Sequence, residues 1–251
     1  MHLAQDFSEL FTLASLISLI TLSLLEIVLG IDNIIFISIV ANKLPREQQA
    51  KARSVGLMLA LVMRIILLFS ISWIVGLKEP LFEAFGFEAT GRDLILFAGG
   101  LFLLVKTTTE IHNKIEGNEE SGPKIKKVAL NAIITQIVFI DIVFSFDSIL
   151  TAVGLVSNLL VMILAVIIAM VIMLIFSEKV SDFINNNPTI KMLALAFLLM
   201  IGMLLVLDAA HIHVPKEFVY FSMAFSLLVE FLNIRLKRKE ERRRNSSNES
   251  N

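Results

Sequence analysis

The chain has 251 residues, of which 56% are hydrophobic and 18% are charged, and its mean hydropathy is +0.81. This composition argues against a water-soluble globular domain, in which about 45–50% of residues are apolar and about 25% are charged. The formal net charge of −1 argues against nucleic acid as a partner, and the absence of Cys excludes disulfides, thiolate metal sites and cysteine nucleophiles.

The apolar runs predict seven membrane-spanning helices. A helix needs about 20 mainly apolar residues to cross a hydrocarbon layer about 30 Å thick. We therefore predict an all-α, polytopic transmembrane helical bundle, with a transmembrane domain at 1–236 and a basic, disordered cytoplasmic tail at 237–251. The predicted spans lie at about 10–41, 54–77, 92–109, 128–156, 158–177, 190–207 and 216–235.

Lysine and arginine indicate the orientation of these spans, because both residues prefer the cytoplasmic side of a membrane. With seven spans, a cytoplasmic C-terminus places most of the 22 Lys and Arg residues in cytoplasmic segments. We therefore expect a multi-pass protein of the cell inner or plasma membrane with its N-terminus outside. The basic tail is expected to contact anionic lipid.

The sequence contains one clear internal repeat. Residues 25–36 (LEIVLGIDNIIF) match residues 140–151 (IDIVFSFDSILT). The match keeps both acidic positions, and shared acids are stronger evidence than shared hydrophobicity, because apolar helices resemble one another readily. The aligned acids are Glu26 with Asp141 and Asp32 with Asp147.

The position of the repeat predicts its topology. The first copy opens three spans and the second copy opens the next three, so the two copies cross the membrane in opposite directions. This pattern predicts an inverted 3+3 repeat, which is typical of transporters. The repeats cover about 10–109 and 128–207, and an extra helix follows at about 216–235.

The opposite directions also predict which acids lie at the same depth. Asp32 lies about 9 Å further along the first span than Glu26, at about 1.5 Å per residue. If the two acidic helices cross near the midplane, Glu26 is level with Asp147, and Asp32 is level with Asp141. Between the acids of each copy we expect the helix to unwind and free backbone carbonyls as further ligands, at Gly30 and Ser145.

Four carboxylates within the membrane indicate a cation site. Ionised side chains in hydrocarbon are costly unless a positive charge joins them or a proton neutralises them. A divalent cation is the simplest partner, and hydrogen bonds between protonated carboxyls are the structural alternative. Oxygen ligands suit Mn²⁺, Ca²⁺ or Mg²⁺, whereas the absence of Cys, and of His from the predicted spans, disfavours zinc and copper. The candidate metal ligands are Glu26, Asp32, Asn33, Asp141, Asp147 and Ser148.

Arg64 lies in the middle of the second predicted span. It is either a counter-charge to the acidic cluster or a side chain that snorkels to a membrane interface. Because about ten residues separate it from each end of the span, snorkelling would be strained. We therefore interpret Arg64 as a counter-charge to the acidic cluster.

The two acidic segments resemble the two signature stretches of the TerC family of integral membrane proteins. The similarity extends from about residue 10 to about residue 235, and it is close to the branch that consists of the membrane domain alone. The family belongs with the LysE-type exporters, so the resemblance implies an exporter of divalent cations, with Mn²⁺ favoured. It also implies that the metal is bound by Glu26, Asp32, Asp141 and Asp147.

The residues and the resemblance together predict a transporter rather than an enzyme. It would export Mn²⁺ by alternating access in exchange for protons, and it would hold no permanent cofactor. A membrane metal sensor or scaffold linked to tellurium resistance is an alternative. An intramembrane aspartyl protease is a weaker one, because the Gly-x-Gly-Asp sequence is missing before Asp32 and Asp147. His211 and His213, with Asp208, could touch a departing metal ion, but their pattern is also that of an ordinary exposed loop.

Overall fold

The computed structural model contains seven helices that are long and apolar enough to cross a membrane, among the residues that it describes. Those residues are 12–70, 80–84, 87–116, 129–156 and 158–248. The prediction of an all-α, polytopic bundle with seven spans is confirmed. The spans are Leu13–Ala41, Arg46–Phe69, Gly91–Ile115, Leu130–Leu155, Leu159–Asn186, Pro188–Ala209 and Phe218–Lys237.

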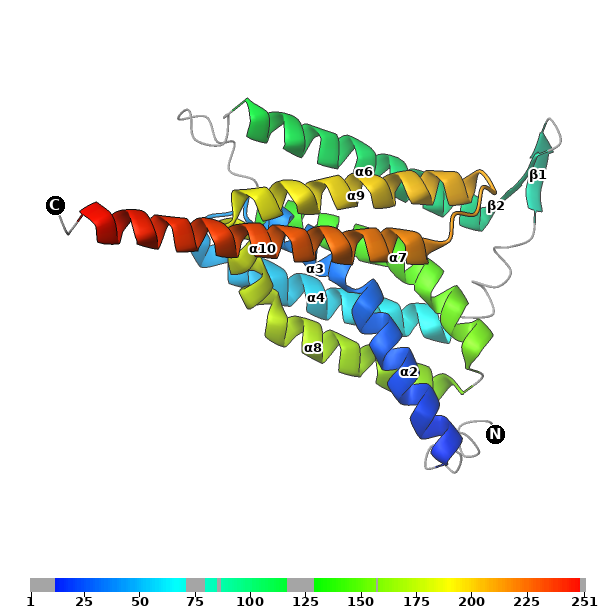
Figure 1. Cartoon of the computed structure of the whole chain (residues 1–251). Coiled ribbons are helices and arrows are strands. Elements are labelled where there is room, and N and C mark those ends of the chain that lie inside the picture. Colours follow the sequence, from blue (N-terminus) through cyan, green and yellow to red (C-terminus); the bar gives the residue numbers. More distant parts are fainter. Residues whose placement is uncertain (1–11, 71–79, 85–86, 117–128, 157, 249–251) are drawn as a thin grey trace.

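The first span consists of two helices, α2 (Leu13–Leu29) and α3 (Ile31–Ala41), which meet at Gly30. The backbone of Gly30 keeps near-helical angles (φ −83°, ψ −9°), and its N–H donates to the Glu26 carbonyl at 2.8 Å. The chain therefore bends at Gly30 rather than unwinding. Figure 1 shows α2 slanting away from the bundle that contains α3.

The second acidic helix does not break. Helix α7 (Leu130–Leu155) runs through Ser145 without interruption, so the unwinding expected there is wrong. The Ser145 hydroxyl lies 2.5 Å from the carbonyl oxygen of Asp141, one turn earlier, and donates to it. A serine can make this bond within a helix, and its presence therefore does not end one.

A small antiparallel hairpin, absent from the predicted elements, connects the second and third spans. It leads directly into the third span, where Thr90 and Asp93 form a capping box that fixes the start of the helix. The two strands are too short to form an apolar run of the length that predicts a span, so the apolar runs did not indicate them. These elements are α4 (Arg46–Phe69), β1 (Pro80–Ala84), β2 (Phe87–Thr90) and α6 (Gly91–Ile115).

The second half of the chain continues with α8 (Leu159–Asn186), α9 (Pro188–Ala209) and α10 (Lys216–Asn248). The end of α10 corrects the predicted disordered tail, because residues 237–248 are helical. This stretch is rich in Lys, Arg and Glu, which are good helix formers.

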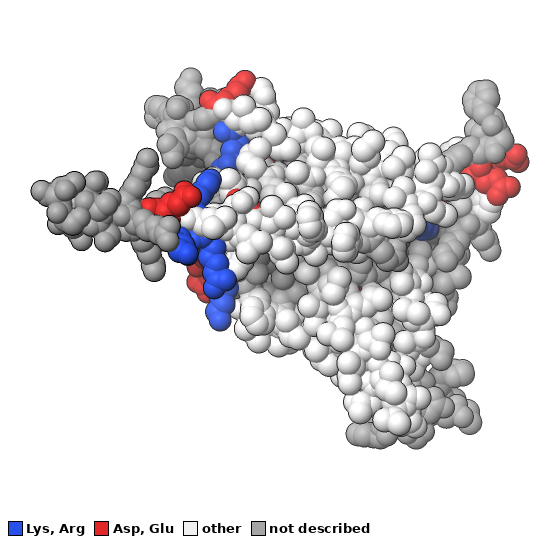
Figure 2. All heavy atoms as spheres, viewed as in Figure 1, with Lys and Arg blue, Asp and Glu red and all other residues white. Residues whose placement is uncertain are grey.

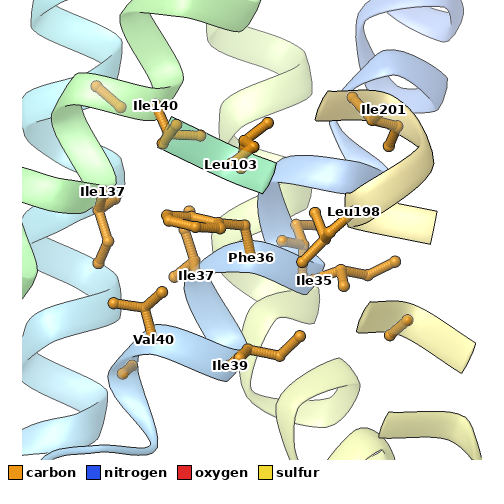
Figure 3. Close-up of a cluster of buried hydrophobic side chains, with 14 of the residues drawn as sticks. Ile35, Phe36, Ile37, Ile39, Val40, Leu103, Ile137, Ile140, Leu198 and Ile201 are labelled. Carbon is orange, nitrogen blue, oxygen red and sulfur yellow. The ribbon is translucent and has the colours of Figure 1, made fainter. Parts of the chain in front are cut away.

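Helix α3 lies in the middle of the bundle. All of its residues from 32 to 41 are buried, and it packs against α4, α7, α8 and α9. Figure 3 shows Phe36 and Ile37 among Leu103 of α6, Ile137 of α7 and Leu198 of α9. Because these residues are covered by other parts of the protein, α3 is enclosed by protein rather than by lipid.

The helices around α3 pair in a regular way. α6 packs along α9, α4 along α7, and α2 along α8. Where α6 crosses α9, Gly100 faces Gly202: a Cβ on Gly100 would lie 2.7 Å from the Gly202 carbonyl oxygen. Small residues allow two helix backbones to approach this closely. α10 packs mainly on α9 and is the least buried of the seven spans.

Candidate functional site

Arg64 of α4 joins two of the candidate acids inside the bundle. Its Nη1 donates to Glu26 Oε2 of α2 at 2.8 Å, while Nη2 and Nε donate to Asp141 Oδ1 and Oδ2 of α7 at 2.8 and 3.1 Å. The side chain of Arg64 is 4% exposed, and those of both acids are 2% exposed. The paired contact with Asp141 uses the fork geometry in which a guanidinium matches a carboxylate.

The packing of the helices explains this meeting. α4 lies along α7, which brings Arg64 beside Asp141, and Glu26 lies one turn before the bend at Gly30. Exposed ion pairs contribute little to stability, whereas breaking a buried pair leaves an uncompensated charge and is strongly destabilising. The three side chains therefore depend on one another for their burial.

Asn33 of α3 adds a further contact to Asp141, since its Nδ2 donates to Asp141 Oδ1 at 3.1 Å. The amide oxygen of Asn33 is buried and has no hydrogen-bond partner among the described residues, and the same holds for Ser23 Oγ and Gln136 Oε1. Buried polar atoms are normally paired, and oxygens without a donor are suited to water or to a hard cation. We call Glu26, Asn33, Arg64 and Asp141 the guanidinium cluster.

Asp32, the neighbour of Asn33 in the chain, lines a small cavity together with Ser148 of α7. The volume of this Asp32 cavity is about 50 Å³, and the rest of its wall is mainly apolar, including Leu29, Phe144 and Tyr220. A cavity of this size, with a carboxylate and a hydroxyl in its otherwise apolar wall, has room for water or for a small ion with part of its hydration shell. The candidate ligands thus fall into two adjacent groups: the acids and Asn33 of the guanidinium cluster, and Asp32 with Ser148 at the Asp32 cavity.

Asp147 lies on α7 next to Ser148, but its side chain is outside the described part of the structure. Among the described side chains, no three of His, Asp and Glu come together in a group that could hold a metal ion. Glu26 and Asp141, which were expected at different depths, share one partner, Arg64. A guanidinium offers five N–H donors, so two acids that do not face each other directly can meet on it.

A second polar cluster joins the start of α6 to the connection between α9 and α10. Arg92 Nη2 donates to Asp208 Oδ2 at 2.6 Å, and His213 Nδ1 lies 2.7 Å from Asp208 Oδ1. His211 Nε2 lies 2.9 Å from Asp93 Oδ2, and His211 has a left-handed backbone with φ of 60°. Both histidines are exposed but bound to acids of the protein, so they tie the connection to the bundle.

The sequence model of one family, described as "Integral membrane protein TerC family", matches residues 11–245. The chain belongs to the TerC family. The resemblance carried by the two acidic segments thus holds for nearly the whole sequence. Membership of this family of integral membrane proteins agrees with the seven apolar helices and makes the chain a multi-pass membrane protein.

Several named TerC-family relatives are similar over most of this chain. A UPF0053 protein of Haemophilus influenzae is 49% identical over 223 residues, which are 88% of this chain and 94% of that protein. The UPF0053 inner membrane protein YgdQ of Escherichia coli is 51% identical over 214 residues, which are 85% of this chain and 90% of that protein. The UPF0053 inner membrane protein YoaE of Escherichia coli is 49% identical over 216 residues, which are 86% of this chain and 42% of that protein. No solved structure matches the chain.

Two residues of this site, Ser145 and Tyr220, were not among the predicted ligands. Ser145 Oγ lies 3.1 Å from Asp141 Oδ2 as well as near the Asp141 carbonyl oxygen. Its place one turn after an intramembrane acid is a signal that could have found it. Tyr220 lines the Asp32 cavity from α10. Nothing in its surrounding sequence distinguishes it from a lipid-facing aromatic residue.

Proposed function

We propose that this protein is a transporter that exports a divalent cation, Mn²⁺ above others, across the inner membrane in exchange for protons. The ligands of the ion would come from the guanidinium cluster and from the Asp32 cavity. The observation that carries the proposal is the guanidinium cluster, in which acids from two matching sequence segments meet at one buried arginine. Ionisable residues inside a membrane are costly and by default mark an ion pathway.

The charges in the bundle favour a cation as a further partner. Arg64 offers one positive charge to two carboxylates, and Asp32 is buried close by in the chain. The other buried arginine, Arg53, contacts Ser181 rather than these acids. Because charges interact strongly where the effective dielectric constant is low, excess negative charge attracts a metal ion or protons.

The kinds of ligand favour a hard ion. Carboxylates, the free amide oxygen of Asn33 and the hydroxyl of Ser148 are all oxygen donors, which suit Mn²⁺, Mg²⁺ and Ca²⁺. This chemistry does not choose among the three ions. The preference for Mn²⁺ rests on the resemblance to exporters of the same family.

Arg64 gives the site a partner when no metal is bound. Its guanidinium holds carboxylate oxygens of Glu26 and Asp141 that a cation would also use. A metal ion that binds these oxygens would compete for them with Arg64, whose positive charge also repels the ion. In this proposal Arg64 and the metal alternate, so that the acids are never left buried without a positive partner.

An inverted repeat accounts for the way in which the helices pair. A two-fold axis in the membrane plane exchanges the two repeats, so their third helices can pair with each other across it. Where the first helix of one repeat packs on the second helix of the other, the same axis requires the reciprocal pair as well. The packing of α6 on α9, α4 on α7 and α2 on α8 supports this arrangement. Alternating access would follow from one repeat rocking against the other around the acids.

We place the C-terminus in the cytoplasm and the N-terminus outside. The relative YgdQ is named an inner membrane protein. Figure 2 shows, on one face, a broad and nearly uncharged band between two charged ends. Most of the visible basic side chains, together with some acidic ones, lie at the end towards the C-terminus, and mainly acidic side chains lie at the hairpin end. Because Lys and Arg accumulate on the cytoplasmic side, this distribution supports the proposed orientation.

The test is Mn²⁺ flux in proteoliposomes that contain the purified protein, with an imposed pH gradient. We expect saturable flux that exceeds that of Ca²⁺ and Mg²⁺ and that is lost in Asp32→Asn and Asp141→Asn. Glu47→Gln, which changes an exposed acid at the start of α4, is the matched control and should keep the flux.

The other outcomes separate the alternatives. Binding of Mn²⁺ without flux under any gradient would indicate a sensor or scaffold instead of a transporter. Neither binding nor flux of any divalent ion would return the acids to a structural role. Wild-type flux in both acid variants would overturn the assignment of the site.

A further inference from the structure

A large cavity lies beyond the Asp32 cavity, walled by α2, α9 and α10. Its volume is about 770 Å³, and polar residues such as Arg92, Thr151 and His213 share its wall with apolar residues of α2. A further cavity of about 650 Å³, lined in part by Glu88 of the hairpin and by His211, has the same three polar residues in its wall. We call these two adjoining cavities the vestibule.

Three side chains line both the vestibule and the Asp32 cavity: Leu29 of α2, Leu204 of α9 and Tyr220 of α10. We call them the partition. The cavity on one side of the partition contains Asp32 and Ser148, and the cavity on the other side contains the polar residues of the vestibule. A displacement of the partition would therefore connect a candidate ion site to a cavity more than ten times larger.

Of the three side chains, Tyr220 is the best placed to move. It lies on α10, which packs mainly on α9 and is the least buried span. Leu29 precedes the bend at Gly30, and Leu204 lies on α9, which also packs along α6. A shift of α10 would thus withdraw Tyr220 while the helices that hold the guanidinium cluster stay in place. The aromatic ring supplies bulk, and the phenolic group can bond to water or to a polar neighbour.

We propose that the vestibule is a water-filled route between the outer surface and the Asp32 cavity, and that Tyr220 closes its inner end. The identity of the passing species, a small hydrated cation, rests on the proposed function. The access of water to Asp32 does not, so it can be measured without any metal ion.

The sequence contains no cysteine, so single cysteines report access without a background. Ser148→Cys places a thiol in the Asp32 cavity, and Thr151→Cys places one in the vestibule. Each variant is treated in right-side-out and in inside-out membrane vesicles with a charged, membrane-impermeant methanethiosulfonate. In right-side-out vesicles we expect Thr151→Cys to react quickly and Ser148→Cys slowly.

Truncation of Tyr220 should expose the thiol in the Asp32 cavity to the reagent. In the Ser148→Cys background, Tyr220→Ala should raise the reaction rate at least about tenfold, because the rate follows the fraction of molecules that are open. Tyr220→Phe keeps the ring and should keep the slow rate. Phe218→Ala, which truncates an exposed aromatic residue on the same helix, is the matched control and should change nothing. If Tyr220→Ala does not accumulate in the membrane, Leu204→Ala opens the same partition from α9.

Three results would overturn the proposal. An unchanged rate in the variant that truncates the partition would show that these side chains do not limit access. Reaction of Thr151→Cys with the permeant N-ethylmaleimide alone would show that the vestibule holds lipid. Reaction only in inside-out vesicles would place the route on the cytoplasmic side. Since no metal is used, a failure here is distinct from a failure of Mn²⁺ flux.

Discussion

Glu26 and Asp141 each place a carboxylate oxygen 2.8 Å from a terminal nitrogen of one guanidinium, that of Arg64. The two acids occupy matching positions in the two similar segments of the sequence. Because Arg64 is buried and pairs with both acids, the stability of the bundle depends on the same side chains that the proposed transport uses. Stability measurements can therefore probe the site without a transport assay.

Removal of the arginine should be costly. We expect Arg64→Met to lower the free energy of unfolding by about 3–5 kcal/mol, because it leaves two buried carboxylates without their positive partner. Mn²⁺ should raise the thermal midpoint of this variant more than that of the wild type, since the ion would fill the vacated place. Thermal unfolding in detergent measures both effects. Arg46→Met, at the exposed start of the same helix, is the control, and equal losses in the two variants would contradict the prediction.

The two acids should differ in importance. Asp141 accepts two bonds from Arg64 and one from Asn33, whereas Glu26 accepts one bond from Arg64. We therefore expect Asp141→Asn to cost at least about 1 kcal/mol more than Glu26→Gln, since a typical hydrogen bond contributes about that much. Denaturant or thermal unfolding of both variants under one condition tests the order. The reverse order would mean that Glu26 has partners beyond the guanidinium.

Glycines at the crossing of α6 and α9 should not tolerate a methyl group. A Cβ on Gly100 would meet the carbonyl oxygen of Gly202, a backbone atom that no rotamer change can move. Gly100→Ala should therefore destabilise the protein by about 1–3 kcal/mol, the usual cost of overpacking. Gly154→Ala on α7 is the matched control, because a Cβ there has no neighbour within 4 Å and alanine favours a helix. Equal effects of the two substitutions would argue against the close crossing.

The bend in the first span should be coupled to α8. A Cβ on Gly30 would overlap Met173 Sδ and would lie 2.9 Å from the Glu26 carbonyl oxygen. Gly30→Ala should lower the thermal midpoint, and Met173→Ala should relieve part of that loss by removing the thioether. In a double-mutant cycle we expect a coupling of about 0.5–3 kcal/mol, as for residues in direct contact. Strictly additive effects would show that the two residues do not touch.

The sequence predicted the spans well because a bilayer imposes a minimum apolar length that local patterns reveal. It was weaker at the ends of helices. α6 continues to Ile115, because Glu110 is buried there and pairs with Lys43, a contact that apolar runs do not report. The helical end of α10 was not predicted, because its high charge is also typical of disordered segments, although its Lys, Arg and Glu residues favour a helix.

The candidate site could be predicted only in part. The repeat that keeps its acids and the arginine in the middle of a span are both patterns of the sequence. They indicated Glu26, Asp141 and Arg64 as candidates. Which acid meets the arginine depends on how α2, α4 and α7 pack. The contribution of Tyr220 depends on where α10 lies against α9. Neither arrangement is encoded in the spacing of residues along one helix.

The central position of α3 has a consequence for the order in which the protein is made. α3 is covered by α4 and by three helices, α7, α8 and α9, that the ribosome delivers much later. Membrane helices insert first and associate afterwards, so Asp32 and Asn33 enter the bilayer before most of their surroundings exist. Arg64 arrives early enough to meet Glu26, but its second acid arrives only with α7. Completion of the first half of the protein must therefore wait for synthesis of the second.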